Sequence, residues 1–78
     1  MIFLIEYDRA RGALVEFKSF DDSRRQQAEA ERLALELERN RTTPEHEIVL
    51  LEAVSEKAVR RTHRRYFERI EDLAVARQ

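Results

Sequence analysis

The chain has 78 residues, of which 40% are charged and 42% hydrophobic, and its formal net charge is −1. That balance is typical of a single folded domain, residues 1–78, and not of a disordered segment. Because the chain has no cysteine, disulfides and thiolate metal sites are excluded, and self-association is the remaining way to supplement so small a core. No apolar run approaches the length of about 20 residues that a membrane span requires, so the expected location is the cytoplasm.

The first predicted element is a strand over residues 2–7, the densest apolar run in the chain. Phe3 and Ile5 point to one face of this strand, and Ile2 and Leu4 point to the other. Because both faces are largely apolar, we expect a central strand that is buried on both sides.

A second strand is predicted over residues 13–20, joined to the first by a hairpin. A three-residue loop over 10–12, with Gly12 in the left-handed conformation, sets Tyr7 opposite Val15 and gathers apolar side chains of both strands on one face. A loop shorter or longer by one residue shifts the register and turns side chains of the second strand to the wrong face. The pattern therefore favours the three-residue loop.

A helix is predicted over residues 23–39, which are rich in strong helix formers. Leu35 falls on the side that we expect to face solvent, where it is either a scattered surface leucine or part of a contact. At about 100° per residue, the side chains expected to face the sheet are Ala30, Leu33, Ala34 and Leu37.

A third strand is predicted over residues 47–53, where four consecutive aliphatic residues again indicate burial on both faces. A second, long helix is predicted over residues 55–76, with Ser55 as its N-cap. The apolar stripe of this helix consists of Val59, Tyr66, Ile70, Leu73 and Ala74.

These elements predict an α+β, two-layer ββαβα fold, with a three-stranded sheet in the order 2-1-3 and two helices. Both helices are expected on the sheet face of Phe3 and Ile5, which leaves the opposite face open. Because an open apolar face usually marks an interaction site, we expect a homodimer; the alternative is a monomer whose second helix crosses over and covers that face. The candidate interface consists of Ile2, Leu4, Leu14, Ile48 and Leu50.

The strongest local charge bias lies in residues 57–69, which carry six Lys or Arg against one Glu. Such a helix face can contact nucleic-acid phosphates or an acidic partner protein. The plainer interpretation is a solvated face on which Glu56 pairs with Arg60 and Glu68 with Arg64. The candidate contact residues are Lys57, Arg60, Arg61, Arg64 and Arg65.

No pattern typical of catalysis, of a cofactor or of a metal site is present in the sequence. The predicted register sets Glu6 opposite Glu16, and facing carboxylates can bind a cation, although Lys18 or solvent can equally relieve them. His46 and His63 stand alone and are expected to be packing residues. We therefore predict a non-enzymatic protein–protein interaction or regulatory module without cofactors, with nucleic-acid binding through the arginines as the alternative. An enzyme would require Glu6, Glu16 and His46 to converge.

Overall fold

The computed structural model describes residues 1–68 and has the predicted order of strands and helices. Three antiparallel strands form one sheet in the order β2-β1-β3, so the α+β class, the ββαβα order and the strand order are confirmed. The strands are β1 (Ile2–Asp8), β2 (Ala13–Phe20) and β3 (His46–Glu52). The helices are α1 (Arg25–Thr42), preceded by the 3-10 turn η1 (Asp22–Arg24), and α2 (Glu56–Thr62), followed by the 3-10 turn η2 (Arg64–Tyr66).

β1 is the central strand, and all seven of its residues are buried, as expected from the two-sided apolar pattern. Its two faces contribute to two separate clusters. Ile2 and Leu4 pack with Phe20 on one face, and Ile5 and Tyr7 pack on the other face.

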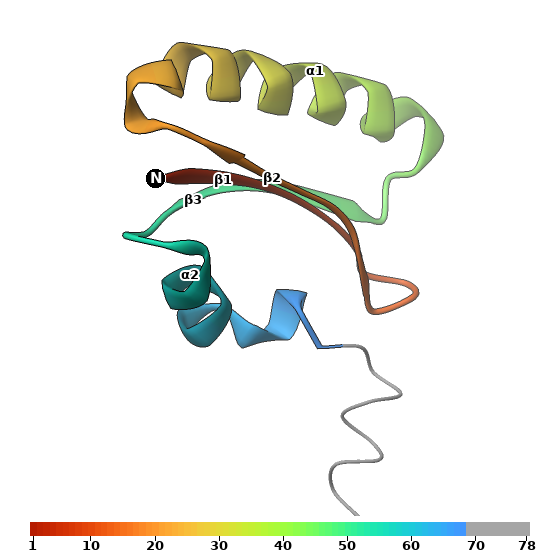
Figure 1. Cartoon of the computed structure of the whole chain (residues 1–78). Coiled ribbons are helices and arrows are strands. Elements are labelled where there is room, and N and C mark those ends of the chain that lie inside the picture. Colours follow the sequence, from red (N-terminus) through yellow and green to blue (C-terminus); the bar gives the residue numbers. More distant parts are fainter. Residues whose placement is uncertain (69–78) are drawn as a thin grey trace, which may run out of the picture.

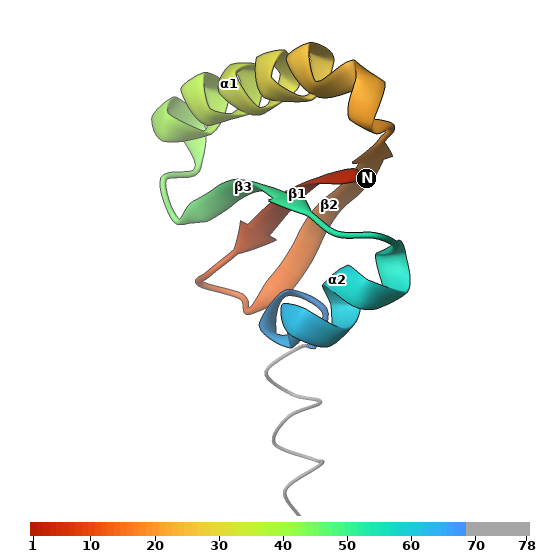
Figure 2. The same ribbon diagram turned by 90° about the vertical axis from the view of Figure 1, so that its left-hand side faces the viewer.

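The two helices cover opposite faces of the sheet (Figures 1 and 2). α1 packs on the face of Ile2 and Leu4, and η2 packs on the face of Ile5 and Tyr7. The prediction that both helices lie on one face is therefore wrong. Three strands spaced about 4.8 Å apart make a face only about 15 Å wide, and a helix is about 10–12 Å across. Each face consequently has room for about one helix.

The hairpin between β1 and β2 differs from the predicted one. Gly12 has a φ of 63°, so its left-handed conformation is confirmed. The loop, however, spans residues 9–12, because Asp8 lies opposite Ala13 and Tyr7 lies opposite Leu14. A bulge between Glu16 and Leu14 takes up the extra residue and restores the expected pairing of Ile5 with Phe17.

The second helix is shorter than predicted. α2 ends at Thr62, and His63 leaves the helical region with φ −124° and ψ 51°. The chain then turns so that Tyr66 reaches the sheet, where its ring packs edge-on against Tyr7 at 5.4 Å between centroids. The remaining members of the predicted stripe, Ile70, Leu73 and Ala74, lie outside the described residues. Within residues 1–68, no helix is both long and apolar enough to cross a membrane.

Candidate interaction surfaces

α1 turns to the sheet the opposite side from the one predicted. Ala28 is fully buried, and Leu35 packs on the cluster of Ile2 and Leu4. Leu33 and Leu37, which were expected to be buried, are 53% and 60% exposed. The predicted stripe therefore faces away from the sheet. We call this surface the outer face of α1; it consists of Ala30, Leu33, Ala34 and Leu37, all of them exposed.

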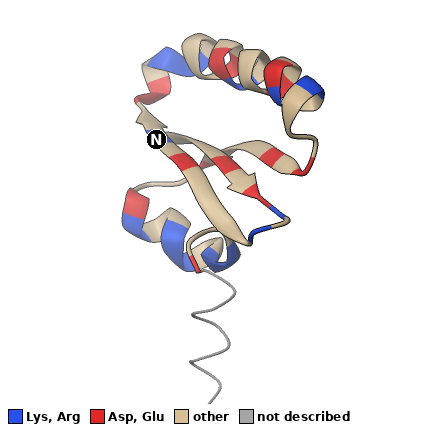
Figure 3. Ribbon diagram, turned by 90° about the vertical axis from the view of Figure 1, so that its right-hand side faces the viewer, with Lys and Arg blue, Asp and Glu red and all other residues tan. Residues whose placement is uncertain are grey.

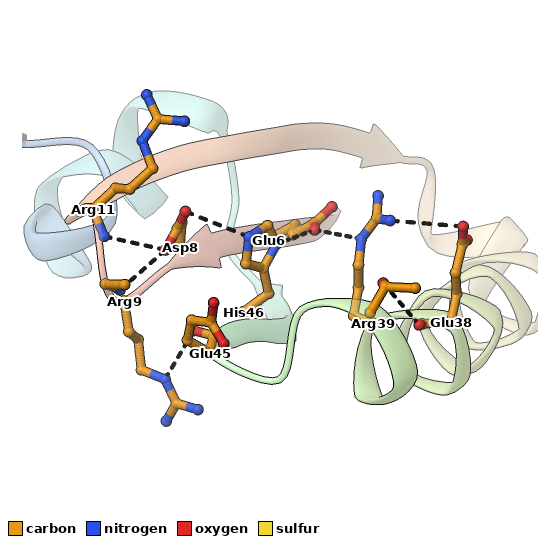
Figure 4. A network of polar contacts seen from close by, with 10 residues as sticks. Glu6, Asp8, Arg9, Arg11, Glu38, Arg39, Glu45 and His46 are labelled. Atoms are coloured by element: carbon orange, nitrogen blue, oxygen red, sulfur yellow. Dashed lines mark hydrogen bonds and ion pairs between the residues drawn. The ribbon is translucent and has the colours of Figure 1, made fainter.

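The buried carboxylate of Glu6 accounts for this rotation of α1. Glu6 lies on the α1 side of β1 and is only 1% exposed. Arg39, on α1, donates a hydrogen bond from Nε to Oε2 of Glu6 at 2.7 Å, and Nδ1 of His46, at the start of β3, lies 2.5 Å from the same oxygen (Figure 4). Burial acts to raise the pKa of Glu6, but the hydrogen bonds from His46 and Arg39 outweigh it and hold this pKa below its ordinary value.

The magnitudes show why the ion pair, and not the apolar stripe, sets the rotation of α1. A buried carboxylate that loses its partner costs several kcal/mol. Completing the burial of Leu33 and Leu37 would gain only about 1–1.5 kcal/mol for each, since only 53% and 60% of these side chains remain to be covered. Two further ion pairs join α1 to the sheet when the helix is rotated in this way. Arg25 Nη2 of α1 lies 2.6 Å from Glu52 Oε1 of β3, and Lys18 Nζ of β2 lies 2.8 Å from Glu31 Oε1 of α1.

The polar network continues from Glu6 to the hairpin. Nε2 of His46 lies 3.5 Å from Oδ2 of Asp8, and Oδ1 of Asp8 accepts hydrogen bonds from the backbone N–H groups of Ala10 and Arg11. Glu6 and His46 thus meet, whereas Glu16 stays exposed and makes no hydrogen bond to either of them. The network ties α1, β1, β3 and the hairpin loop together. No group of three or more His, Cys, Asp or Glu side chains that could hold a metal occurs in residues 1–68.

The five residues of the predicted interface do not form an open patch. Ile2 and Leu4 are 0% and 1% exposed beneath α1, and Ile48 and Leu50 pack beside them, half-buried. Leu14 lies on the opposite sheet face, because the bulge in β2 turns it toward the α2 side. The expectation of an uncovered sheet face is therefore wrong, and α1 supplies the cover.

The outer face of α1 has acidic borders. At about 100° per residue, Glu29 and Glu36 flank it on one side and Glu38 flanks it on the other. Gln26 and Arg41 lie at its two ends. The surface is therefore an apolar stripe along a helix of 18 residues, with three carboxylates beside it.

The predicted basic residues do gather on one part of the molecule, along α2 and η2 (Figure 3). Three of them are paired with carboxylates: Arg60 with Glu56 at 2.9 Å, Arg64 with Glu68 at 3.0 Å and Arg65 with Glu47 at 2.9 Å. The pairs of Arg60 and Arg64 are those expected of a solvated helix face.

Two of the basic side chains also cover aromatic rings. The guanidinium of Arg60 lies 4.5 Å from the centroid of Phe67, and that of Arg65 lies 4.1 Å from the centroid of Tyr66. Lys57 and Arg61 are exposed and form no ion pair with any residue of the part that the structure describes. Of the five predicted contact residues, only Lys57 and Arg61 are therefore without an ion pair to another residue of 1–68.

Sequence reasoning missed three residues that organise these surfaces. These are Arg39, which lies on the helix side opposite the predicted apolar stripe, His46 and Glu47. The one available signal was Glu6 itself, because a carboxylate inside a two-sided apolar strand requires a cation from the layer above it.

The chain matches no protein-family model, no curated protein and no solved structure.

Proposed function

We propose that this chain is a non-enzymatic protein–protein interaction module that binds its partner through the outer face of α1. The supporting observation is that Leu33 and Leu37 are 53% and 60% exposed on one apolar stripe. Single exposed leucines are ordinary. Leu33 and Leu37, however, lie one helical turn apart, and the exposed Ala30 and Ala34 adjoin them on the same helix face. The four side chains together make a contiguous apolar surface. The Glu6–Arg39 pair holds α1 so that this surface is presented to solvent.

The partner that fits this surface is an amphipathic helix with basic side chains beside its apolar face. Small residues such as Ala30 and Ala34 let a second helix approach to an interaxial distance of about 8 Å. Lysine or arginine on the borders of that helix would meet Glu29, and would share Glu36 with Arg32 and Glu38 with Arg39, which already pair with them. Exposed leucines spaced like Leu33 and Leu37 are the usual anchors of helix-to-helix recognition.

The experiment compares affinity purifications from extracts of the source cells, using the wild-type chain and a Leu33→Glu/Leu37→Glu variant as baits. The matched control is Val54→Glu, because Val54 is 87% exposed but lies outside α1. The expected result is a partner retained by the wild type and by the control and lost with the α1 variant, while all three chains melt at similar temperatures. A partner retained equally by all three baits, or no specific partner at all, would contradict the proposal.

A second candidate function is nucleic-acid binding through α2. It is supported by Lys57 and Arg61, which are exposed and unpaired within residues 1–68. Two phosphate contacts give a weak, salt-dependent interaction. Filter binding of a mixed-sequence RNA and DNA pool at low salt tests it, with Lys57→Glu/Arg61→Glu as the variant and Arg24→Glu as the control. Binding that is absent at low salt, or equal in the two variants, removes this candidate.

A further inference from the structure

β3 has the composition of an inner strand but the position of an edge strand. Ile48, Val49, Leu50 and Leu51 are consecutive aliphatic residues, a pattern typical of burial on both faces. The strand order β2-β1-β3 nevertheless places β3 at the edge of the sheet. All four side chains are partly buried: Ile48 and Leu50 pack on the α1 side of the sheet, and Val49 and Leu51 pack on the α2 side.

The backbone of β3 has an unused row of hydrogen-bonding groups. Arg9 N–H donates to the carbonyl of Glu45, and Ala53 and Met1 exchange both of their hydrogen bonds. Because hydrogen-bonded positions alternate along an antiparallel pair, the odd-numbered residues of β3 direct their N–H and C=O groups toward β1. Ile48 and Leu50 consequently direct theirs away from the sheet, where no strand of residues 1–68 lies.

The other edge of the sheet, β2, is protected in ways that β3 is not. β2 carries a bulge and the charged residues Glu16 and Lys18 along its length. Bulges and charged side chains, lysine above all, are the usual means by which an edge strand avoids pairing with another chain. Between its end residues, β3 has no bulge, lysine, proline or glycine, and its one charged residue there, Glu47, is paired with Arg65 of the same chain. β3 is therefore the less protected of the two edges.

We propose that a second copy of this chain pairs with the edge of β3, antiparallel and with two-fold symmetry, to give a continuous six-stranded sheet. The unpaired backbone groups fit an extended strand as the occupant. A strand that is apolar on both faces matches the partly buried aliphatic side chains, and β3 itself is such a strand.

One register of this pairing is self-complementary. It sets Val49 at the two-fold axis, Ile48 opposite the second copy's Leu50, and His46 opposite the second copy's Glu52. Apolar residues then oppose apolar residues at the three central positions, and Glu47 lies opposite the second copy's Leu51. Moving the axis to Leu50 sets Glu52 against Ile48, a carboxylate–aliphatic pair like that of Glu47 with Leu51, and it no longer sets the two polar end residues, His46 and Glu52, opposite one another.

Amide hydrogen exchange of the wild-type protein, followed residue by residue by NMR, tests the pairing without any mutation. In the proposed dimer, the N–H groups of Ile48 and Leu50 are protected at high protein concentration and lose that protection on dilution. The N–H groups of Val49 and Leu51 bond to β1 and stay protected at both concentrations. Fast exchange of Ile48 and Leu50 at every concentration, with Val49 and Leu51 protected, would overturn the proposal.

A charge swap at the axis tests the symmetry. Val49→Lys and Val49→Glu each place like charges opposite one another, so each variant alone should dimerise more weakly than the wild type, by about tenfold or more. An equimolar mixture should regain a dimer that contains one copy of each, which sedimentation and native mass spectrometry detect. Val15→Lys is the matched control, since Val15 is 48% exposed on β2, and it should leave dimerisation unchanged.

The outcomes separate this inference from the proposed function. Leu33→Glu/Leu37→Glu should leave the dimer intact, because the outer face of α1 takes no part in the β3 contact. A dimer lost in that variant but kept in both Val49 variants would refute the β3 pairing, as would a wild-type chain that stays monomeric at millimolar concentration. A mixture of the two Val49 variants that stays monomeric would refute the two-fold arrangement about Val49.

Discussion

Replacing Arg39 with alanine should destabilise the fold far more than its place on a helix surface suggests. The partner of Arg39 is Glu6, which is 1% exposed. Breaking a buried ion pair costs about 3–5 kcal/mol because it leaves one charge without a partner. The side chain of Arg39 is 30% exposed and His46 stays in place, so we expect a loss of about 2–3 kcal/mol in the free energy of unfolding. Urea denaturation followed by circular dichroism should show a midpoint lowered by about 2 M.

Arg32→Ala is the matched control for this experiment. Arg32 lies on the same helix but pairs with Glu36 one turn along, and such a pair contributes about 0.5 kcal/mol or less. The change in helix propensity is the same in both variants, so the difference between them isolates the buried pair. Equal losses for Arg39→Ala and Arg32→Ala would refute the reasoning. In a Glu6→Gln background, moreover, Arg39→Ala should cost clearly less than it does in the wild type.

Three further predictions follow from the same structure. Because the pKa of Glu6 is held below its ordinary value of 4.5, the free energy of unfolding should fall as the pH drops below that value, and Glu6→Gln should flatten this fall in acid titrations. Gly12→Ala should lower the free energy of unfolding by about 1 kcal/mol in thermal melts, since Gly12 has a φ of 63°. Burial and the hydrogen bond to Glu47 raise the pKa of Tyr66 from 10.0 to about 12. The contribution of Tyr66 to the free energy of unfolding should therefore be full below pH 10 and be lost as the pH rises toward 12. Tyr66→Phe should remove this alkaline dependence, which unfolding measurements at a series of pH values would detect.

The strands were predictable because their signal is local. The apolar runs of β1 and β3 and the left-handed Gly12 each follow from a few adjacent residues. The loop length was not predictable in the same way. A three-residue loop, and a four-residue loop followed by a bulge at Val15, both set Ile5 opposite Phe17. The sequence pattern could not distinguish the two, because they differ only in the pairing of residues 13–15, next to the loop.

The rotation of α1 shows where periodicity fails. Its apolar stripe would place Leu33 and Leu37 on the sheet, and that inference holds only if the sheet face is uniformly apolar. Glu6 makes the face beneath α1 partly charged, so the helix side with Arg39 is favoured although it carries fewer large apolar residues. Recognising this from the sequence would have required pairing two residues that lie 33 positions apart.

The two proposals have one geometric consequence in common. The two-fold axis of an antiparallel strand pair stands perpendicular to the sheet, so it maps each sheet face onto itself. α1 and its copy would then lie on the same side of the six-stranded sheet, with both outer faces directed away from it. A partner with two basic amphipathic helices could engage both faces at once, and the effective concentration of the second contact would raise its affinity above that of either contact alone. Loss of the β3 pairing should therefore weaken such a partner even though it touches only α1.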